Sequence, residues 1–176
     1  MQRKGRGSAT TCKLSDMILD KICFFIALLL VALMAGLFFS FSIAVTRGLK
    51  QLDDKSYLRA MQKINKAILN PVFLLSFLGA PVLLMATTVL RFITDHQLFM
   101  WMVVISLVYI GGVFMVTMFC NVPLNNYLEQ QEIDALDPEA ARAARSRFEI
   151  PWNRYNHIRT LFSVLTCGMM IYTGLV

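Results

Sequence analysis

The sequence has few of the residues from which enzymes usually build metal or haem centres. It contains two histidines, His96 and His157, which lie in separate polar stretches, and its long apolar runs hold no carboxylate. A zinc site or a bis-histidine haem would require distant ligands to converge. We therefore predict no metal site.

Other familiar chemistries lack their sequence motifs as well. The chain has no glycine-rich phosphate loop, no dinucleotide-binding fingerprint and no serine nucleophile elbow. Its four cysteines lie far apart and form no CxxC pair, which indicates small buried side chains rather than a disulfide framework. We predict no bound cofactor. The cysteines are Cys12, Cys23, Cys120 and Cys167.

What the sequence has in abundance is apolar residues. Hydrophobic residues make up 57% of the 176 positions, far above the proportion in soluble domains. This composition predicts an integral, multi-pass membrane protein, placed in the cell membrane or, in a bacterium, the inner membrane. The formal net charge of +6 then bears on topology and anionic lipid, because no nucleic-acid-binding motif accompanies it.

Hydropathy divides the chain into a polar basic tail, residues 1–21, and a single membrane domain, residues 22–176. The domain contains four apolar runs, each long enough to cross a bilayer as a helix. No small-residue cleavage pattern follows the first run, so we expect it to be retained. The predicted fold is all-α, an integral membrane four-helix bundle. The expected spans cover residues 22–45, 72–92, 98–120 and 155–176.

An amphipathic stretch, residues 53–70, follows the first span. Its basic residues and its apolar residues fall on opposite faces at helical spacing, which predicts an interfacial helix on the membrane surface. The Asn70-Pro71 step is expected to end this helix, because proline disfavours helical geometry in the residue before it. Asn65 belongs to neither stripe and either faces solvent or turns inward.

Two polar clusters flank the last two spans. Residues 121–126 (NVPLNN) end the third span and residues 151–160 (PWNRYNHIRT) lead into the fourth, so the number of spans puts both on one side of the membrane. In a helix, Trp152, Asn156 and Arg159 share one face, while His157 points about a quarter-turn away.

Arg159 marks a candidate site, because a guanidinium at the edge of hydrocarbon is costly unless it finds a partner or water. Two interpretations stay open from the residues alone. Trp152 and Arg159 either anchor the helix at the interface or line a pocket. The amides of the first cluster, Asn121 and Asn125, either cap a helix end or complete that pocket.

Four motifs follow one another along the chain: residues 36–41 (GLFFSF), 60–65 (AMQKIN) with Asn70-Pro71, 121–126 (NVPLNN) and 152–160 (WNRYNHIRT). In this order they resemble the successive motifs of the anthrone oxygenase-like family, over roughly residues 28–176. The chain departs from the family's pattern at Arg47-Gly48, where many members carry a proline before the glycine.

The characterised members of that family are mainly fungal enzymes that oxidise polyketide anthrones to anthraquinones with dioxygen. The resemblance therefore implies a cofactor-independent oxygenase for anthrone-like or other flat phenolic substrates, with dioxygen as co-substrate. Such a reaction needs a base, donors for the developing phenolate and an apolar slot for flat rings. The resemblance assigns catalysis to His157 as the base with Arg159, Asn156 and Asn125 as donors, and substrate contacts to Trp152, Asn121, Asn65, Phe38 and Phe41.

The competing function is non-enzymatic. A polar cap that binds a lipid headgroup, a quinone or a partner subunit would use Arg159 and the basic stripe as an anion receptor. Convergence of Asn121, Asn125, Asn156 and Arg159 on an aromatic-walled cavity favours a small-molecule site, whereas separate helix caps in water favour a structural role. The expected partners are the lipid bilayer and an aromatic small molecule, not nucleic acid, and oligomerisation is compatible with the sequence.

Overall fold

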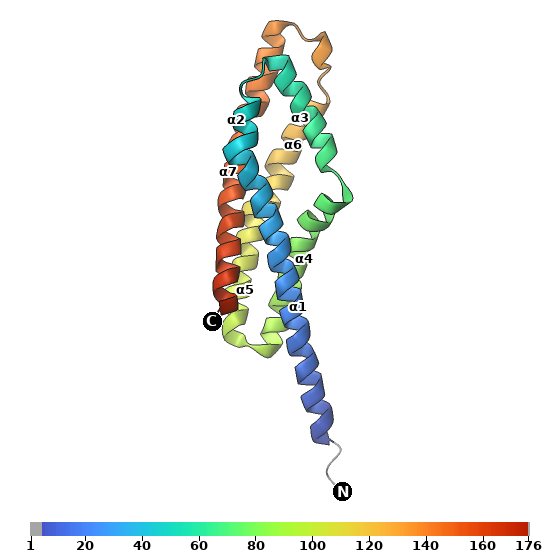
Figure 1. Ribbon diagram of the computed structural model, residues 1–176, viewed down its shortest axis with the longest axis vertical. Coiled ribbons are helices and arrows are strands. Elements are labelled where there is room, and N and C mark those ends of the chain that lie inside the picture. The colour runs from blue at the N-terminus through green and yellow to red at the C-terminus, as the bar shows by residue number, and fades with distance from the viewer. Residues whose placement is uncertain (1–4, 176) are drawn as a thin grey trace.

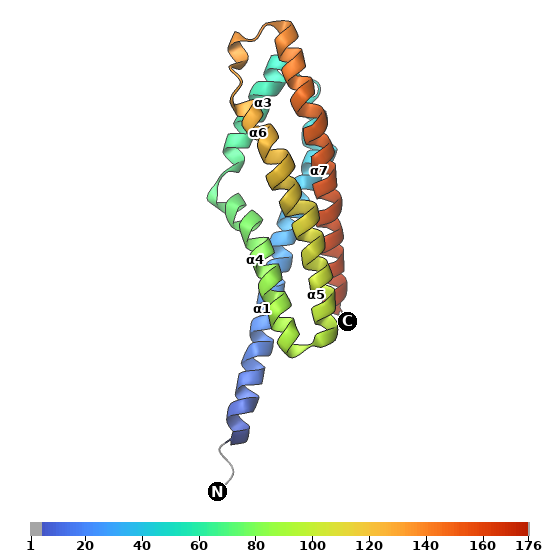
Figure 2. The same cartoon turned by 180° about the vertical axis from the view of Figure 1, so that it is seen from behind.

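A computed structural model describes the backbone of residues 5–175 and the side chains of residue 15 and residues 17–175. The described chain is helical almost throughout and contains no strand, which confirms the all-α prediction (Figures 1 and 2). Cys23, Cys120 and Cys167 are free thiols. The side chain of Cys12 and the first four residues of the basic tail lie outside the described residues.

Four helical segments are long and apolar enough to cross a membrane, so the chain is a multi-pass membrane protein. Figure 1 follows the chain up, down, up and down again through them. They cover Met17–Leu49, Pro71–Thr94, His96–Glu129 and Pro138–Leu175.

The first rod consists of α1 (Gly5–Ser40), a π-helical turn η1 (Phe41–Val45) and α2 (Thr46–Leu49). Two separate helices then return towards the other end of the molecule (Figure 1). They are α3 (Asp54–Ile68) and α4 (Pro71–Thr94).

The third rod continues past the predicted span, which ended at residue 120, because two π-helical turns keep its backbone helical. It consists of α5 (His96–Tyr109), η2 (Ile110–Met115), η3 (Thr117–Asn121) and α6 (Val122–Glu129). A 3-10 turn η4 (Ile133–Ala135) leads to α7 (Pro138–Leu175), which begins well before the predicted fourth span.

Helix starts coincide with capping residues in the sequence. Asp53, Asn70 and Asp137 each accept a hydrogen bond from the backbone N–H three residues further on, at 3.0, 3.0 and 2.8 Å. The bond from Ser56 lowers the pKa of the exposed Asp53 carboxyl. The cap at Asn70 confirms the predicted boundary between α3 and α4, with Pro71 in the first turn of α4.

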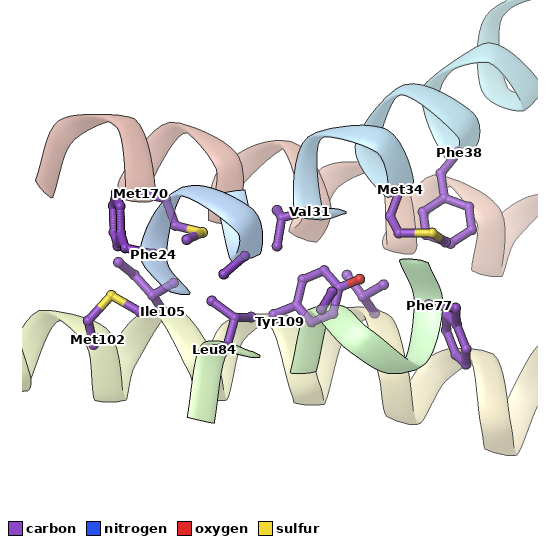
Figure 3. Close-up of a cluster of buried hydrophobic side chains, with 13 residues drawn as sticks. Phe24, Val31, Met34, Phe38, Phe77, Leu84, Met102, Ile105, Tyr109 and Met170 are labelled. Carbon is purple, nitrogen blue, oxygen red and sulfur yellow. The ribbon is translucent and has the colours of Figure 1, made fainter. Parts of the chain in front are cut away.

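One apolar cluster holds the four spanning segments together (Figure 3). Each segment contributes fully or almost fully buried side chains, such as Val31 from α1, Leu84 from α4, Ile105 from α5 and Met170 from α7. The close packing extends to the backbone. A Cβ added at Gly112 would lie 2.1 Å from the ring of Phe162, so only glycine allows η2 to approach α7 this closely.

A second apolar cluster joins α3, α6 and the first half of α7, which together form the cap of the molecule. Tyr57, Leu58 and Met61 of α3 are fully buried in it, with Leu128 of α6 and Phe148 of α7. The apolar stripe that we expected on the membrane surface therefore packs against protein. The reason is that α6 and α7 extend beyond the expected spans and offer an apolar partner, which removes the stripe from water.

A buried ion pair joins α1 and α4 near the end of the bundle opposite the cap. The Nε of Arg91 lies 2.8 Å from the carboxylate of Asp20, and both side chains are about nine-tenths buried. The guanidinium also lies over the ring of Phe24, at 5.3 Å from the centroid. The sequence assigned Asp20 to the polar tail and Arg91 to the end of a span, and it gave no sign that they pair.

Candidate functional site

Where the spanning bundle meets the cap, the helices enclose a cavity of about 420 Å³. Residues of the first rod, α3, α4, the third rod and α7 line it, including members of both apolar clusters. Both polar clusters of the sequence reach it, through Asn125 and Asn126 of α6 and through Trp152, Asn156 and Arg159 of α7.

Aromatic rings make up much of the cavity wall. Phe38 and Phe41 contribute from the first rod, Phe73 and Phe77 from α4, and Trp152 from α7. The rings of Phe73 and Phe77 stack with centroids 5.6 Å apart, and Phe41 packs against Trp152 at 5.5 Å. Such faces suit a flat, apolar ring system. The predicted aromatic slot of Phe38, Phe41 and Trp152 is therefore present, and α4 extends it.

Arg159 is the buried cation of this cavity, with 6% of its surface exposed. Its Nη2 donates to Asn156 Oδ1 at 3.0 Å and its Nη1 to Thr117 Oγ1 at 3.4 Å, while the Nε–H has no hydrogen-bond partner. Its Cζ lies 4.3 Å from the ring centroid of Phe38 and 5.6 Å from that of Trp152. No carboxylate among the described residues forms an ion pair with it.

Asn156 holds the guanidinium in place. Its Nδ2 donates to the backbone oxygen of Phe38 at 3.1 Å and to Ser42 Oγ at 2.9 Å. This leaves its Oδ1 as the acceptor for Arg159 and fixes the orientation of the amide. Asn156 is 1% exposed, and the predicted shared face of Trp152, Asn156 and Arg159 is confirmed by their common position along the cavity.

Ser42 is a site residue that the sequence did not single out. It lies in the π-helical turn η1, and an extra residue per turn rotates the following side chains by about 100° relative to a regular helix. The turn brings Ser42 Oγ within 2.8 Å of Thr160 Oγ1 and within 3.1 Å of His157 Nδ1. The GLFFSF motif ends one residue before it.

The hydrogen bonds around Ser42 bear on the protonation of His157. Thr160 donates its hydroxyl proton to the backbone oxygen of Asn156 at 2.9 Å, so Ser42 must donate to Thr160. The Ser42 oxygen then accepts from Asn156 and from His157, and this network assigns a proton to His157 Nδ1. His157 is exposed and does not line the cavity, and it is linked to Asn156 only through Ser42.

The predicted amides divide into three environments. Asn125 lines the cavity and accepts the indole N–H of Trp152 at 2.9 Å through its Oδ1. Asn65 of α3 also lines the cavity, and its buried Nδ2 has no hydrogen-bond partner. Asn121 is buried beside the site, but both of its side-chain polar atoms lack partners and it is not part of the lining. Two of these three amides are thus brought to the site.

Two charged residues of the cavity were also missed by the sequence reasoning. Lys66 of α3 and Glu129 of α6 both line it, and Lys66 Nζ lies 2.7 Å from Glu129 Oε1. In the sequence, Lys66 belongs to the basic stripe of residues 53–70 and Glu129 to the polar loop after the third span. Only the packing of α3 against α6 shows that the two side chains form an ion pair. Among the described residues, no group of three or more His, Cys, Asp or Glu side chains is placed to hold a metal.

The sequence model of the anthrone oxygenase family matches residues 58–169, well over half of the chain. This chain belongs to the anthrone oxygenase family. Three of the four motifs lie within the matched range, and the GLFFSF motif precedes it. No curated protein and no solved structure matches the chain.

Membership of the anthrone oxygenase family fits the geometry of the cavity. Asn125, Asn156 and Arg159 converge on an aromatic-walled space instead of capping separate helices in water. Three of the four residues whose convergence would indicate a small-molecule site thus line one cavity, and the fourth, Asn121, does not.

Proposed function

We propose that the cavity is the active site of a cofactor-independent oxygenase that oxidises anthrone-like or other flat phenolic substrates with dioxygen. The observation that carries this proposal is Arg159, a buried cation without a carboxylate partner in an aromatic-walled cavity. A preorganised cation at such a position favours the ionised form of a bound acid. A flat substrate that becomes an anion during the reaction fits both features.

An anthrone carries a CH₂ group between two rings and opposite a ketone. Loss of one proton gives an anion whose charge is delocalised onto the ketone oxygen, and Arg159 would donate to that oxygen. Asn125 accepts the indole N–H of Trp152 with its Oδ1, which leaves its Nδ2 to donate to the substrate. Asn156 acts through Arg159, because its own polar atoms are already engaged.

The oxidation itself needs no metal. The carbanion passes one electron to dioxygen, and the resulting superoxide combines with the carbon radical to form a hydroperoxide after protonation. Loss of water from the C–H and O–O groups then leaves a second ketone. The CH₂ group and O₂ thus become C=O and H₂O, with four electrons transferred to oxygen and no other reductant.

Glu129 is the group that we assign as the proton acceptor. It is a carboxylate of the cavity lining, whereas His157 lies outside the cavity. Its side chain is 45% exposed, so it can pass the proton on to water. The ion pair with Lys66, at 2.7 Å, holds the carboxylate in position at the rim of the cavity.

The test is oxygen uptake by the purified protein with a model anthrone, after subtraction of uncatalysed autoxidation. We expect Arg159→Met to lower kcat/KM about 100-fold, the usual loss when a donor to a developing oxyanion is removed. Glu129→Gln is expected to lower kcat by about 100-fold with little change in KM. Arg154→Met is the matched control, because Arg154 is an exposed arginine of the same helix.

Uptake that the control retains and both site variants lose would support the proposal. Equal rates for all four proteins would reject anthrone oxidation. If the anthrone still bound in that case, the non-enzymatic receptor for a lipid or quinone would become the better interpretation.

A further inference from the structure

Some side chains that line the cavity are also exposed on the outer surface of the bundle. Leu74 and Leu78 of α4 are 39% and 49% exposed, and Met118 of η3 across from them is 42% exposed. These three residues, here called the lipid portal, are apolar and belong to spanning helices. This opening of the cavity therefore meets hydrocarbon instead of water.

The depth of the portal follows from helix geometry. Leu78 lies seven residues after Pro71, so it is about 10 Å along α4 at a rise of 1.5 Å per residue. The whole of α4 has 24 residues and is about 36 Å long, against a hydrocarbon core of about 30 Å. Leu78 thus lies below the start of the span, within the apolar layer. Figure 2 shows the α3–α4 corner displaced to one side of α6.

The opposite rim of the cavity is polar. Lys66 and Glu129 line it and form an ion pair at 2.7 Å that joins α3 to α6, with the exposed Asn126 one turn from Glu129. Both charged side chains are substantially exposed, so this rim meets water. An exposed pair of this kind adds little stability, but it places two opposite charges across the aqueous entrance.

We propose that substrate enters the cavity from the bilayer through the lipid portal, as a neutral, apolar, flat aromatic molecule, and ionises only beside Arg159. A neutral ring system can dissolve in the hydrocarbon and pass the leucine and methionine side chains. The same molecule as an anion would be held in the cavity by Arg159 and excluded from the bilayer. This inference rests on the proposed function for the identity of the substrate, but the route itself is tested without turnover.

The experiment measures quenching of Trp152 fluorescence in lipid vesicles. Trp152 lines the cavity and is 5% exposed, and the chain has two tryptophans, so the Trp101→Phe protein reports on the cavity alone. The two probes share one ring system: anthraquinone, which is neutral and dissolves in the bilayer, and its sulfonate, which is anionic and stays in water. We expect anthraquinone to quench Trp152 at least about tenfold faster than the sulfonate.

Portal variants then locate the route. Leu78→Phe and Met118→Phe, in the Trp101→Phe background, are expected to slow quenching by anthraquinone about tenfold. Val82→Phe is the matched control, since Val82 is 63% exposed on the same helix and does not line the cavity.

Faster quenching by the sulfonate, or portal variants that match the control, would overturn entry from the bilayer. Neither result depends on oxygen uptake. A protein that binds anthraquinone through the portal but consumes no oxygen with an anthrone would keep this inference and lose the proposed reaction. If the wild type consumes oxygen with an anthrone but Trp152 in the portal variants is quenched at the normal rate, the proposed reaction is kept and entry through the portal is rejected.

Discussion

Two arginines are buried among the residues that the structure describes, and they lie in opposite electrostatic surroundings. Arg91 and Arg159 are 8% and 6% exposed, and each guanidinium stacks on a phenylalanine ring. Arg91 also has the carboxylate of Asp20 at 2.8 Å, whereas Arg159 has only amide and hydroxyl oxygens. Arg91 is thus neutralised within the packed bundle, and Arg159 keeps its charge at the wall of a cavity.

The difference supports the proposed binding role of Arg159 and a packing role for Arg91. Burying a charge is costly, and a carboxylate partner offsets that cost in the folded state. At Arg91 the protein supplies the partner from its own chain. At Arg159 the amide and hydroxyl oxygens offset only part of the cost of burying the charge, and an anionic ligand would offset the rest. A stable fold gains nothing from an incomplete offset, so the position is better explained by function.

The largest effect on stability is expected from breaking the ion pair between Asp20 and Arg91. Asp20→Asn would leave the Arg91 guanidinium buried without its counter-charge, and the free energy of unfolding is expected to fall by about 3 kcal/mol. Unfolding in detergent, followed by heating or by titration with a denaturing surfactant, measures this change. The double variant Asp20→Asn with Arg91→Leu is expected to recover most of the loss. A single variant as stable as the wild type would show that the pair is not a structural element.

A smaller effect on stability is expected from removing a hydrogen bond that holds Asn156, the residue that orients Arg159. Ser42→Ala removes one of the two acceptors of Asn156 Nδ2 and is expected to cost about 1 kcal/mol of stability. Because Asn156 orients Arg159, kcat/KM for oxygen uptake is expected to fall about tenfold. Ser40→Ala is the control, since Ser40 is exposed and bonds only to its own helix. Equal kinetics in the two variants would remove Ser42 from the site.

The smallest change in stability is expected at Arg159 itself, with the opposite sign. Arg159→Met removes a buried charge that has no ion-pair partner, so the free energy of unfolding is expected to stay constant or to rise by up to about 1 kcal/mol. Arg91→Met is the matched comparison and is expected to destabilise, because it leaves Asp20 buried alone. The same unfolding assay compares the two. A loss of stability at Arg159 equal to that at Arg91 would show that both arginines serve packing.

Several features of the site could be predicted because they depend on one helix at a time. The spacing of Trp152, Asn156 and Arg159 puts them on one face of any helix, and the structure has them on one face of α7. The number of spans put both polar clusters at one end, where Asn125 meets Trp152. Capping chemistry located the start of α4 at Asn70 and Pro71.

Other features depend on how two helices are placed relative to each other, and the sequence gave no access to them. The helical period turns His157 away from Asn156, but only the packing of α7 against the other helices shows that this direction lies outside the cavity. Lys66 and Glu129 meet across a gap between α3 and α6 that no local pattern encodes. The apolar stripe of α3 was correctly found, but its partner proved to be protein, because stripes facing lipid and stripes facing protein have the same composition.

The sequence by itself determined that this protein is helical, crosses a membrane several times and carries a tryptophan, an amide and an arginine on one helix face. These properties follow from composition and from the helical period, which are local. Only the tertiary structure decided that Asp20 neutralises Arg91 and that no carboxylate of the described residues neutralises Arg159. Charge pairing depends on distances of a few ångströms between side chains far apart in the sequence, and those distances are set by the packing of the whole bundle.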